Sequence, residues 1–327
     1  MKMHLPSVIP NFVLSMTLCV FCTSCKKTQT DFNLHQFETS VQDDLTRIWF
    51  DDNLHGHAIG GKQWENGVHL YTSDGGETWS ADTLGDKILF DVCVDSNGTA
   101  LTTGVDGNIW TMSADTAPTI WQKRREYLWV MLRGIATNPD GSGYILVGGE
   151  GYQGGIALTL NNSFDEVGRD SFRFELDDIA FTQHQTAFAV GYGAILRTDD
   201  NGQSWTQLDV SGDFFKAIFF ASAQVGYVVG YAGSILKTTD GGTTWKNITD
   251  GTSWFGSGAT FRTLYFLDTE NGYVAGDNGT LWHTTDGGKS WDIGENIAKN
   301  VHFWGICRNN GKIWLAAKDG KLFWFGE

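Results

Sequence analysis

The sequence has few cysteines, few prolines and few basic residues. Its 327 residues include five cysteines, four prolines, and 23 Lys and Arg against 38 Asp and Glu, which gives a formal net charge of -15. Three cysteines lie in the first 25 residues, so only Cys93 and Cys307 remain, and a disulfide framework and a CxxC metal motif are excluded. Whether these two cysteines pair is left open. The shortage of clustered cations excludes nucleic acid as a partner.

Helical periodicity is also missing after residue 30. The chain is instead rich in glycine, with 41 residues, and in aromatic residues, with 14 Trp and 21 Phe, and 41% of it is hydrophobic. This composition excludes a disordered or collagen-like chain. Short runs in which apolar and polar residues alternate, such as residues 217–220 and 263–266, predict β-strands.

The first 25 residues have the pattern of a targeting segment. Lys2 is followed by a mostly apolar stretch over residues 11–21 and by Cys22-Thr23-Ser24-Cys25. The apolar stretch is shorter than the roughly 20 residues that span a bilayer. The pattern resembles a bacterial lipoprotein signal peptide. The resemblance implies a signal peptide over residues 1–24, a diacylglycerol on Cys25, a lipidated tether over residues 25–32 and a folded domain over residues 33–327.

The residues after Cys25 carry a further expectation about location. The chain continues with Lys26-Lys27-Thr28-Gln29-Thr30 and has no aspartate directly after the cysteine. By resemblance to sorted lipoproteins, this predicts an anchor in the outer membrane of the bacterial cell envelope, facing the periplasm.

A motif of the form [ST]-x-D-x-G-x-[ST]-W recurs along the chain. Its Asp and Trp residues are Asp74 and Trp79, Asp200 and Trp205, Asp240 and Trp245, and Asp286 and Trp291. A decayed copy precedes Trp121, and residues 159–163 lie where another copy would be expected. A carboxylate in such a turn accepts N–H bonds, glycine allows a positive φ, and tryptophan packs on the sheet. We therefore interpret the motif as structural.

Aliphatic residues in the first strand of each repeat mark seven units. They are Ile48, Val92, Ile135, Ile179, Ile218, Leu264 and Ile306. Each unit has room for four short strands, which predicts an all-β, seven-bladed β-propeller of four-stranded blades. The last unit ends after its third strand, at residues 321–325, so we expect residues 33–41 to supply the missing strand and close the ring.

The motif resembles the Asp box of bacterial neuraminidase repeats, which lies in the hairpin between the third and fourth strands. The strand order, the Gly226-Tyr227-Val228-Val229-Gly230 type of second strand and the seven units resemble the photosystem II stability and assembly factor family. The resemblance covers residues 45–326. It implies a non-catalytic propeller that binds a protein client during the assembly of a membrane complex.

One set of residues is predicted to ring a mouth of the central channel. It lies two places before the aliphatic markers and consists of Thr46, Phe90, Arg133, Asp177, Lys216, Arg262 and Trp304. We call it the mouth column. Cations, a carboxylate and aromatic rings in one ring favour a binding surface, although solvated strand ends would have the same pattern. Aromatic residues in the longer loops of that face, Trp64, Tyr152, Trp254 and Phe255, are candidates for an apolar rim.

Hydrolysis of a glycan is the alternative. Sialidases share the Asp box and bind a substrate carboxylate with three arginines, for which Arg47, Arg133 and Arg262 are available, but no Tyr-Glu nucleophile pair is identifiable. Asp177 with Asp91 or Asp178 would supply two carboxylates for another type of glycosidase. His55 and His57 lack a third metal ligand. We predict a non-catalytic lipoprotein with a protein client, and no cofactor, metal or catalytic residue; a glycan ligand remains the alternative.

Overall fold

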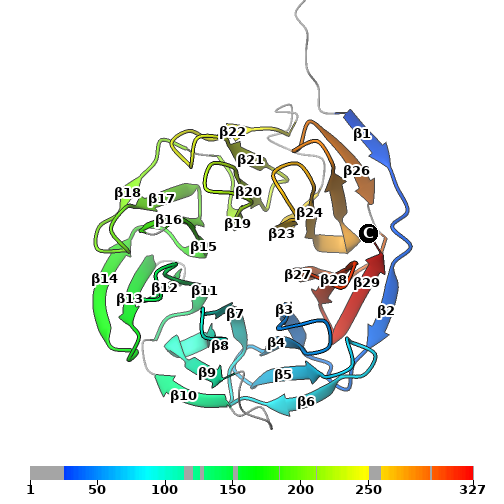
Figure 1. The fold of residues 1–327 in the computed structure, drawn as a ribbon, viewed down its shortest axis with the longest axis horizontal. Helices are drawn as coiled ribbons and strands as arrows, with labels where there is room; N and C mark the ends of the chain where they lie inside the picture. The colour runs from blue at the N-terminus through cyan, green and yellow to red at the C-terminus, as the bar shows by residue number, and fades with distance from the viewer. Residues whose placement is uncertain are drawn as a thin grey trace, which may run out of the picture.

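The computed structural model describes residues 26–113, 121–125, 129–149, 154–183, 185–210, 212–249, 259–294 and 297–326. Within them seven sheets form a ring of blades, and the first strand of each blade faces the centre (Figure 1). Regular structure other than strand consists, in these ranges, of two short 3₁₀ turns, η1 (Val105–Gly107) and η3 (Asp277–Gly279). The fold is the predicted all-β, seven-bladed propeller with four-stranded antiparallel blades.

The strands follow the order of the repeats, and each blade runs from the centre outward. Blades one to three contain β3 (Asp44–Phe50), β4 (Gly56–Lys62), β5 (Asn66–Thr72), β6 (Ser80–Thr83); β7 (Leu89–Val94), β8 (Thr99–Gly104), β9 (Ile109–Ser113), β10 (Trp121–Arg125); and β11 (Leu132–Thr137), β12 (Gly143–Gly149), β13 (Gly155–Asn161), β14 (Glu166–Phe172). Blades four and five contain β15 (Leu176–Gln183), β16 (Thr186–Gly191), β17 (Ala194–Thr198), β18 (Thr206–Gln207); and β19 (Phe215–Phe220), β20 (Gly226–Gly230), β21 (Ile235–Thr238), β22 (Lys246–Asn247). Blades six and seven contain β23 (Phe261–Phe266), β24 (Gly272–Gly276), β25 (Leu281–Thr284), β26 (Ser290–Gly294); and β27 (Phe303–Asn309), β28 (Lys312–Ala317), β29 (Lys321–Gly326).

Two N-terminal strands lie on the outside of blades six and seven (Figure 1). β2 (His35–Glu38) pairs antiparallel with β29, with His35 opposite Trp324, and supplies the fourth strand of blade seven. This confirms the predicted closure. β1 (Lys26–Gln29) adds a fifth, parallel strand to blade six by pairing with β26. Residues assigned above to a tether therefore lie along the side of the propeller. Cys25 and the predicted signal peptide lie outside the described residues.

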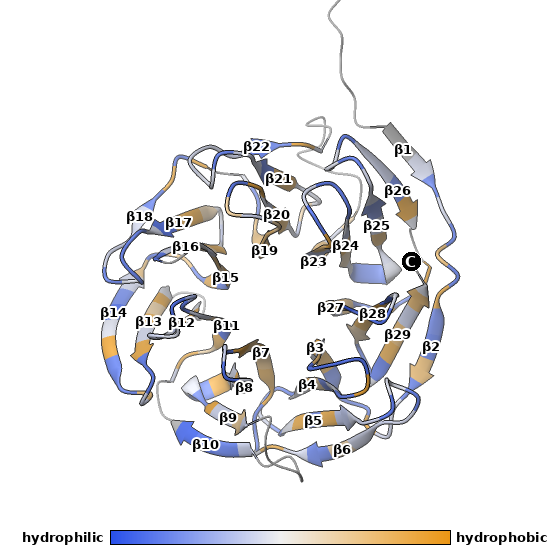
Figure 2. Cartoon of the chain, viewed as in Figure 1, coloured by the Kyte–Doolittle hydropathy of each residue, from blue (hydrophilic) through white to orange (hydrophobic). Residues whose placement is uncertain are grey.

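The core lies within and between the blades. All five residues of β20, a second strand, are buried, whereas both residues of β22, the outermost strand of the same blade, are exposed. The outer strands and loops are accordingly more hydrophilic in Figure 2. No helix in the described ranges is long and apolar enough to cross a membrane.

The Asp boxes hold the outer hairpins and join neighbouring blades. In blade five, Asp240 accepts hydrogen bonds from the backbone N–H of Thr244 at 2.9 Å and from its hydroxyl at 2.6 Å. Gly242, at a φ of 83°, packs directly against the ring of Phe188 in blade four, where a Cβ would not fit. Trp245 packs edge-on against Phe188 with a centroid distance of 6.0 Å. The box thus has the structural role that its sequence predicts.

Candidate functional site at the mouth of the central channel

Every first strand carries a β-bulge at its residue of the mouth column. In blade three, for example, the pairing of β11 with β12 shifts between Leu132 and Gly134, so Arg133 has no partner of its own, and the same shift occurs in the other six blades. A bulge redirects a side chain and is common beside binding sites. It explains how a residue beside a buried first strand reaches the channel in each blade.

The seven residues of the mouth column line one cavity of about 630 Å³. The structure therefore brings together Arg133, Asp177, Lys216, Arg262 and Trp304, although they come from five different blades. Lys62, the last residue of β4 in blade one, and Lys318, in the loop between β28 and β29 of blade seven, complete the wall. Tyr152, Trp254 and Phe255 lie outside the described residues.

Lys216 and Asp177 form an ion pair across the interface of blades five and four. The ammonium nitrogen lies 3.0 Å from Oδ1 of Asp177, and the two side chains are only 16% and 10% exposed. Burial raises the pKa of Asp177 against the opposing charges of Lys216 and Arg133. Burial also lowers the pKa of Lys216. The pair is thus largely buried, and removal of one partner would leave the charge of the other buried and unpaired.

Arg262 is fixed by a carboxylate and by two aromatic rings. Its Nη2 donates to Oδ2 of Asp277 at 2.9 Å and its Nε donates to Oδ1. The guanidinium lies 4.2 Å from the ring centroid of Trp304 and 5.7 Å from that of Tyr231. Burial opposes ionisation of Asp277, but the bonds from Arg262 and His302 hold its pKa below its usual range. Arg262 therefore presents a positively charged plane with a defined orientation.

Arg133 has no carboxylate within ion-pair distance among the described residues. It lies over the ring of Phe90 at 5.4 Å, and its Nη2 is 3.3 Å from the sulfur of Met131. Its Nε is buried without a hydrogen-bond partner in the described structure, as is Nε1 of Trp304. The guanidinium of Arg133 thus lines the cavity without a carboxylate partner in the described structure and can pair with a ligand that carries acceptors.

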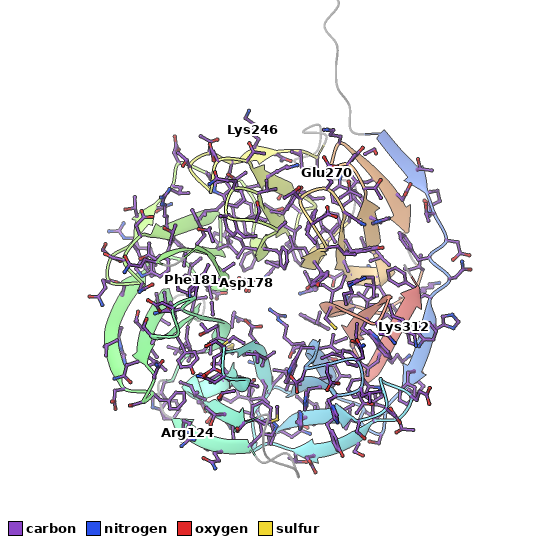
Figure 3. All side chains as sticks on the ribbon, in the orientation of Figure 1. Arg124, Asp178, Phe181, Lys246, Glu270 and Lys312 are labelled. Carbon is purple, nitrogen blue, oxygen red and sulfur yellow. The ribbon has the colours of Figure 1, made fainter. Side chains whose placement is uncertain are left out.

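A second layer of charged side chains lies below the mouth, and these side chains bond to one another and to the backbone. Arg47 Nε donates to Asp91 at 2.6 Å, and its Nη1 donates to the carbonyl of Trp304 at 3.1 Å. Asp178, which faces the centre in Figure 3, accepts the N–H of Ile218 in the next blade at 2.9 Å. Burial, followed by the charge of Asp91, raises the pKa of Asp178 to about 7. These carboxylates join blades.

Exposed aromatic side chains surround the mouth. Trp64 is 51% exposed, Trp129 75%, Tyr192 65% and Tyr231 48%, and all four lie in loops of the face that carries the cavity. Tyr192 packs edge-on against Phe214 at 5.3 Å, and Phe214 in turn lies 3.5 Å below the ammonium of Lys216. We call Trp64, Trp129, Tyr192 and Tyr231 the aromatic rim.

Sequence reasoning found only Trp64 of this rim. Tyr192 and Tyr231 directly follow Gly191 and Gly230, the last residues of their second strands. A search of the position after the glycine that ends a second strand would have found both, because in blades four and five this position opens a loop toward the channel mouth. Trp129 precedes a first strand and has no repeat signal.

The histidines of blade one do not form a metal centre in the described structure. His57 Nδ1 lies 2.9 Å from Nε2 of His69, and its Nε2 lies 2.9 Å from Asp51. Burial, followed by the charge of His57, lowers the pKa of His69 to about 3. His55 instead contacts Asp52. No group of three or more metal-ligating side chains occurs in the ranges that the structure describes.

Comparison with known proteins supports the family resemblance. The sequence model described as photosynthesis system II assembly factor YCF48 matches residues 205–297. The photosystem II assembly protein Ycf48 of Thermosynechococcus vestitus is 30% identical over 185 residues, which are 52% of this chain and 51% of that protein. The chain is therefore similar to this protein over about half of its length. It also matches the chloroplastic stability/assembly factor HCF136 of Arabidopsis thaliana, with 27% identity over 36% of this chain and 30% of that protein. The chain thus spans about half the length, or less, of these relatives.

Solved structures share the fold of this propeller over most of its length. The structure of YCF48 bound to D1 peptide superposes with a TM-score of 0.68 at 16% identity, over 92% of this chain and 99% of that one. YCF48 from Cyanidioschyzon merolae gives 0.66 at 17% identity, over 90% and 98%. Virginiamycin B lyase from Staphylococcus aureus gives 0.73 at 13% identity, over 91% and 100%. At these identities the likeness establishes the architecture alone.

Proposed function

We propose that the propeller is a non-catalytic scaffold or assembly factor that binds a segment of a client protein at the channel mouth. The observation that carries the proposal is the combination of Arg133, a guanidinium donor that lines the cavity and has no carboxylate within ion-pair distance in the described structure, with the exposed aromatic rim around the same cavity. A guanidinium donor fits a carboxylate or a backbone carbonyl of the client. The aromatic rim fits apolar side chains on either side of that group.

The charge of the cavity supports a client with an acidic group. Its lining contains six cations, Arg47, Lys62, Arg133, Lys216, Arg262 and Lys318, against the four carboxylates Asp43, Asp44, Asp177 and Asp319. Arg47 and Arg262 are paired with Asp91 and Asp277, which lie outside this lining, so Arg133 is the lining cation without a carboxylate partner in the described structure. The formal net charge of the whole chain is -15. An acidic side chain or a C-terminal carboxylate of the client would thus meet attraction at the mouth, while the rest of the surface favours basic regions of the same client.

The relatives support a peptide as the ligand. One solved relative, YCF48, is bound to a D1 peptide, and the curated relatives are named as assembly factors. A cavity of about 630 Å³ has room for a few residues of a peptide rather than for a folded domain. The exposed rim would then contact the rest of the client.

Hydrolysis of a sialoside or another glycan is the alternative. Arg47, Arg133 and Arg262 do line one cavity, as a sialidase would require. Arg47 and Arg262 are bound by Asp91 and Asp277, however, and both oxygens of Asp178 accept backbone N–H groups. A glycosidase needs two carboxyl groups free to face the substrate. Turnover of a fluorogenic sialoside by the purified chain would favour this alternative.

Affinity capture from detergent-solubilised envelopes tests the client proposal. The structure selects Arg133→Glu as the informative variant, because Glu in place of Lys216 or Arg262 would leave the buried Asp177 or Asp277 unpaired and disturb the fold. We expect one or two proteins to be recovered with wild type, lost with Arg133→Glu and retained with Lys246→Glu, a charge reversal at the exposed outer edge of blade five. Equal recovery by all three proteins would reject the channel mouth as the client site.

The predicted anchor is a separate part of the proposal. We propose that the chain is lipidated at Cys25 and held in the cell envelope, in the outer membrane and facing the periplasm, and this rests on the N-terminal sequence alone. Labelling of the expressed chain with radioactive palmitate tests it. Wild type should incorporate label and Cys25→Ala should not. Equal labelling of both would refute lipidation at this cysteine.

A further inference from the structure

Met131 places a thioether in the wall of the channel-mouth cavity. It directly precedes β11 in blade three, and its side chain lines the cavity of about 630 Å³. The same side chain packs in an apolar cluster with Ile88 and Val105, which flank the first two strands of blade two. Met131 is therefore held by apolar contacts on one side and borders the open cavity on the other.

Two N–H donors of the cavity wall approach the sulfur of Met131. Nη2 of Arg133 lies 3.3 Å from it, and Nε2 of Gln63, in the loop after β4 of blade one, lies 3.9 Å from it. A thioether sulfur is only a weak acceptor. Arg133 and Gln63 both line the cavity as well. An oxygen atom attached to this sulfur would thus meet a charged and a neutral N–H donor at once.

The other sulfur atoms of the folded domain are less open to an oxidant. The sequence has five methionines, and three of them precede residue 25, which leaves Met112 and Met131. Met112 is 2% exposed and is not among the residues that line the cavity. Burial raises the pKa of the thiols of Cys93 and Cys307, so the reactive thiolate is scarce at neutral pH. Met131 is thus the sulfur placed best for oxidation.

Oxidation of Met131 would change the acceptor that faces Arg133. With hydrogen peroxide as the oxidant, a lone pair of the sulfur attacks one peroxide oxygen, an S–O bond forms and the O–O bond breaks. The second oxygen leaves as water after it takes up the proton of the first. The sulfur loses two electrons, which the peroxide gains. The product is a sulfoxide, a polar group in place of an apolar one, and its oxygen is a much stronger acceptor than the thioether.

We propose that Met131 is an oxidation site that switches the channel mouth off. In the thioether form, the guanidinium of Arg133 is available to an acidic group of the client. In the sulfoxide form, the new oxygen accepts hydrogen bonds from Arg133 and Gln63 and occupies the place of that acidic group. Reduction by a methionine sulfoxide reductase restores the thioether and the site. The inference rests on the proposed function, because it describes the regulation of the same site.

The first test needs no client. The purified full chain is treated with hydrogen peroxide, and mass spectrometry of its peptides follows the gain of one oxygen atom at each methionine. We expect Met131 to react about tenfold faster than Met112, because only Met131 borders the cavity. In a chain labelled with ¹⁵N-arginine, the Nε–H signal of Arg133, assigned by its loss in Arg133→Lys, should shift on oxidation. A Met131 that resists peroxide, or an unshifted Arg133 signal, rejects the proposal.

The second test measures the captured client by surface plasmon resonance before and after treatment with peroxide. Affinity for wild type should fall about tenfold and return after incubation with methionine sulfoxide reductase. Met131→Leu, which has a similar volume and cannot be oxidised, should show no change on treatment, whereas Met112→Leu should respond as wild type does. Met131→Gln, which places an amide oxygen near Arg133, should bind more weakly than Met131→Leu without any peroxide.

The outcomes separate this inference from the proposed function. Equal losses of affinity in wild type and in Met131→Leu would show that another residue is responsible and would overturn the switch. If no client binds the untreated chain, the channel-mouth proposal fails and the regulatory role fails with it. The oxidation rate and the Arg133 signal would still decide, in that case, whether Met131 is an oxidation site that binds Arg133.

Discussion

The carboxylate of Asp91 in blade two accepts the backbone N–H of Ile135 in blade three, at 2.9 Å and 44 residues away in the chain. Asp178 makes the same bond from blade four to Ile218 in blade five. Both aspartates stand one place after the mouth column, so the sites that join the blades lie directly below the candidate binding site. Arg47 neutralises this layer from blade one through its bond to Asp91.

Arg47→Gln should destabilise the propeller strongly. The substitution leaves Asp91 buried without its cation and removes the bond to the carbonyl of Trp304 that links blades one and seven. Breaking a buried pair in this way costs roughly 3–5 kcal/mol of unfolding free energy. Urea denaturation measures it. The double variant Arg47→Gln/Asp91→Asn should recover part of the loss, and a double variant less stable than Arg47→Gln would contradict the electrostatic explanation.

The stability of blade one should fall on mild acidification. Because burial lowers the pKa of His69 to about 3, the folded protein resists a proton that the unfolded chain accepts below about 6.5. The unfolded state is favoured in that window, so His69 costs roughly 1.4 kcal/mol per pH unit between about pH 6.5 and pH 3. Urea denaturation at several pH values should show this slope in wild type and a smaller one in His69→Gln. An unchanged slope would show that His69 is not the titrating group.

The Asp boxes should protect the fold at neutral pH and lose this effect in strong acid. Burial opposes ionisation of Asp286, but bonds from the hydroxyl and N–H of Ser290 hold its pKa below its usual range. The stabilisation is therefore present above the unfolded pKa near 3.9 and is lost as the pH falls through the lower folded value. Asp286→Ala should cost roughly 1–2 kcal/mol at pH 7 after screening by solvent, and progressively less below pH 4. A constant difference would point to packing instead.

Removal of the rim tyrosines should separate binding from folding. Tyr192 and Tyr231 are 65% and 48% exposed, so replacing both by Ala should change the unfolding free energy by less than about 1 kcal/mol. Binding of the captured client should weaken by about tenfold or more, because exposed aromatic residues beside a binding cavity contribute strongly to interfaces. Surface plasmon resonance with the purified client measures the affinity. Unchanged affinity would remove both tyrosines from the proposed interface.

The two N-terminal strands should differ in their effect on stability. A variant without residues 1–30 loses β1 and keeps β2, so blade seven remains closed. A variant without residues 1–41 also exposes the edge of β29 and removes Phe37 and Val41 from the core. We expect the longer truncation to lose roughly 3 kcal/mol or more relative to the shorter one, and to aggregate. Equal thermal midpoints would show that β2 does not close the ring.

Most of the fold could be predicted from local repetition. Each aliphatic marker predicts a strand and each Asp box predicts a turn from a few neighbouring residues alone. The last unit lacked a fourth strand, so another part of the chain had to supply it. The mouth column could be placed around one cavity for the same reason. The ion-pair partners could not be predicted, because Asp277, for example, reaches Arg262 through a 3₁₀ turn. Nor could the pairing of β1 with a strand more than 260 residues away in the chain. Such contacts depend on three-dimensional packing, which a repeat pattern does not encode.

The course of β1 has a consequence for how the ring would sit on a bilayer. The strand begins at Lys26 on the outer circumference of blade six, one residue after the cysteine predicted to carry the lipid. A lipid at that point would attach the propeller to the bilayer by its outer edge, so that neither the channel-mouth face nor the opposite face would lie against the headgroups. Each side could then meet a different partner diffusing in the same membrane.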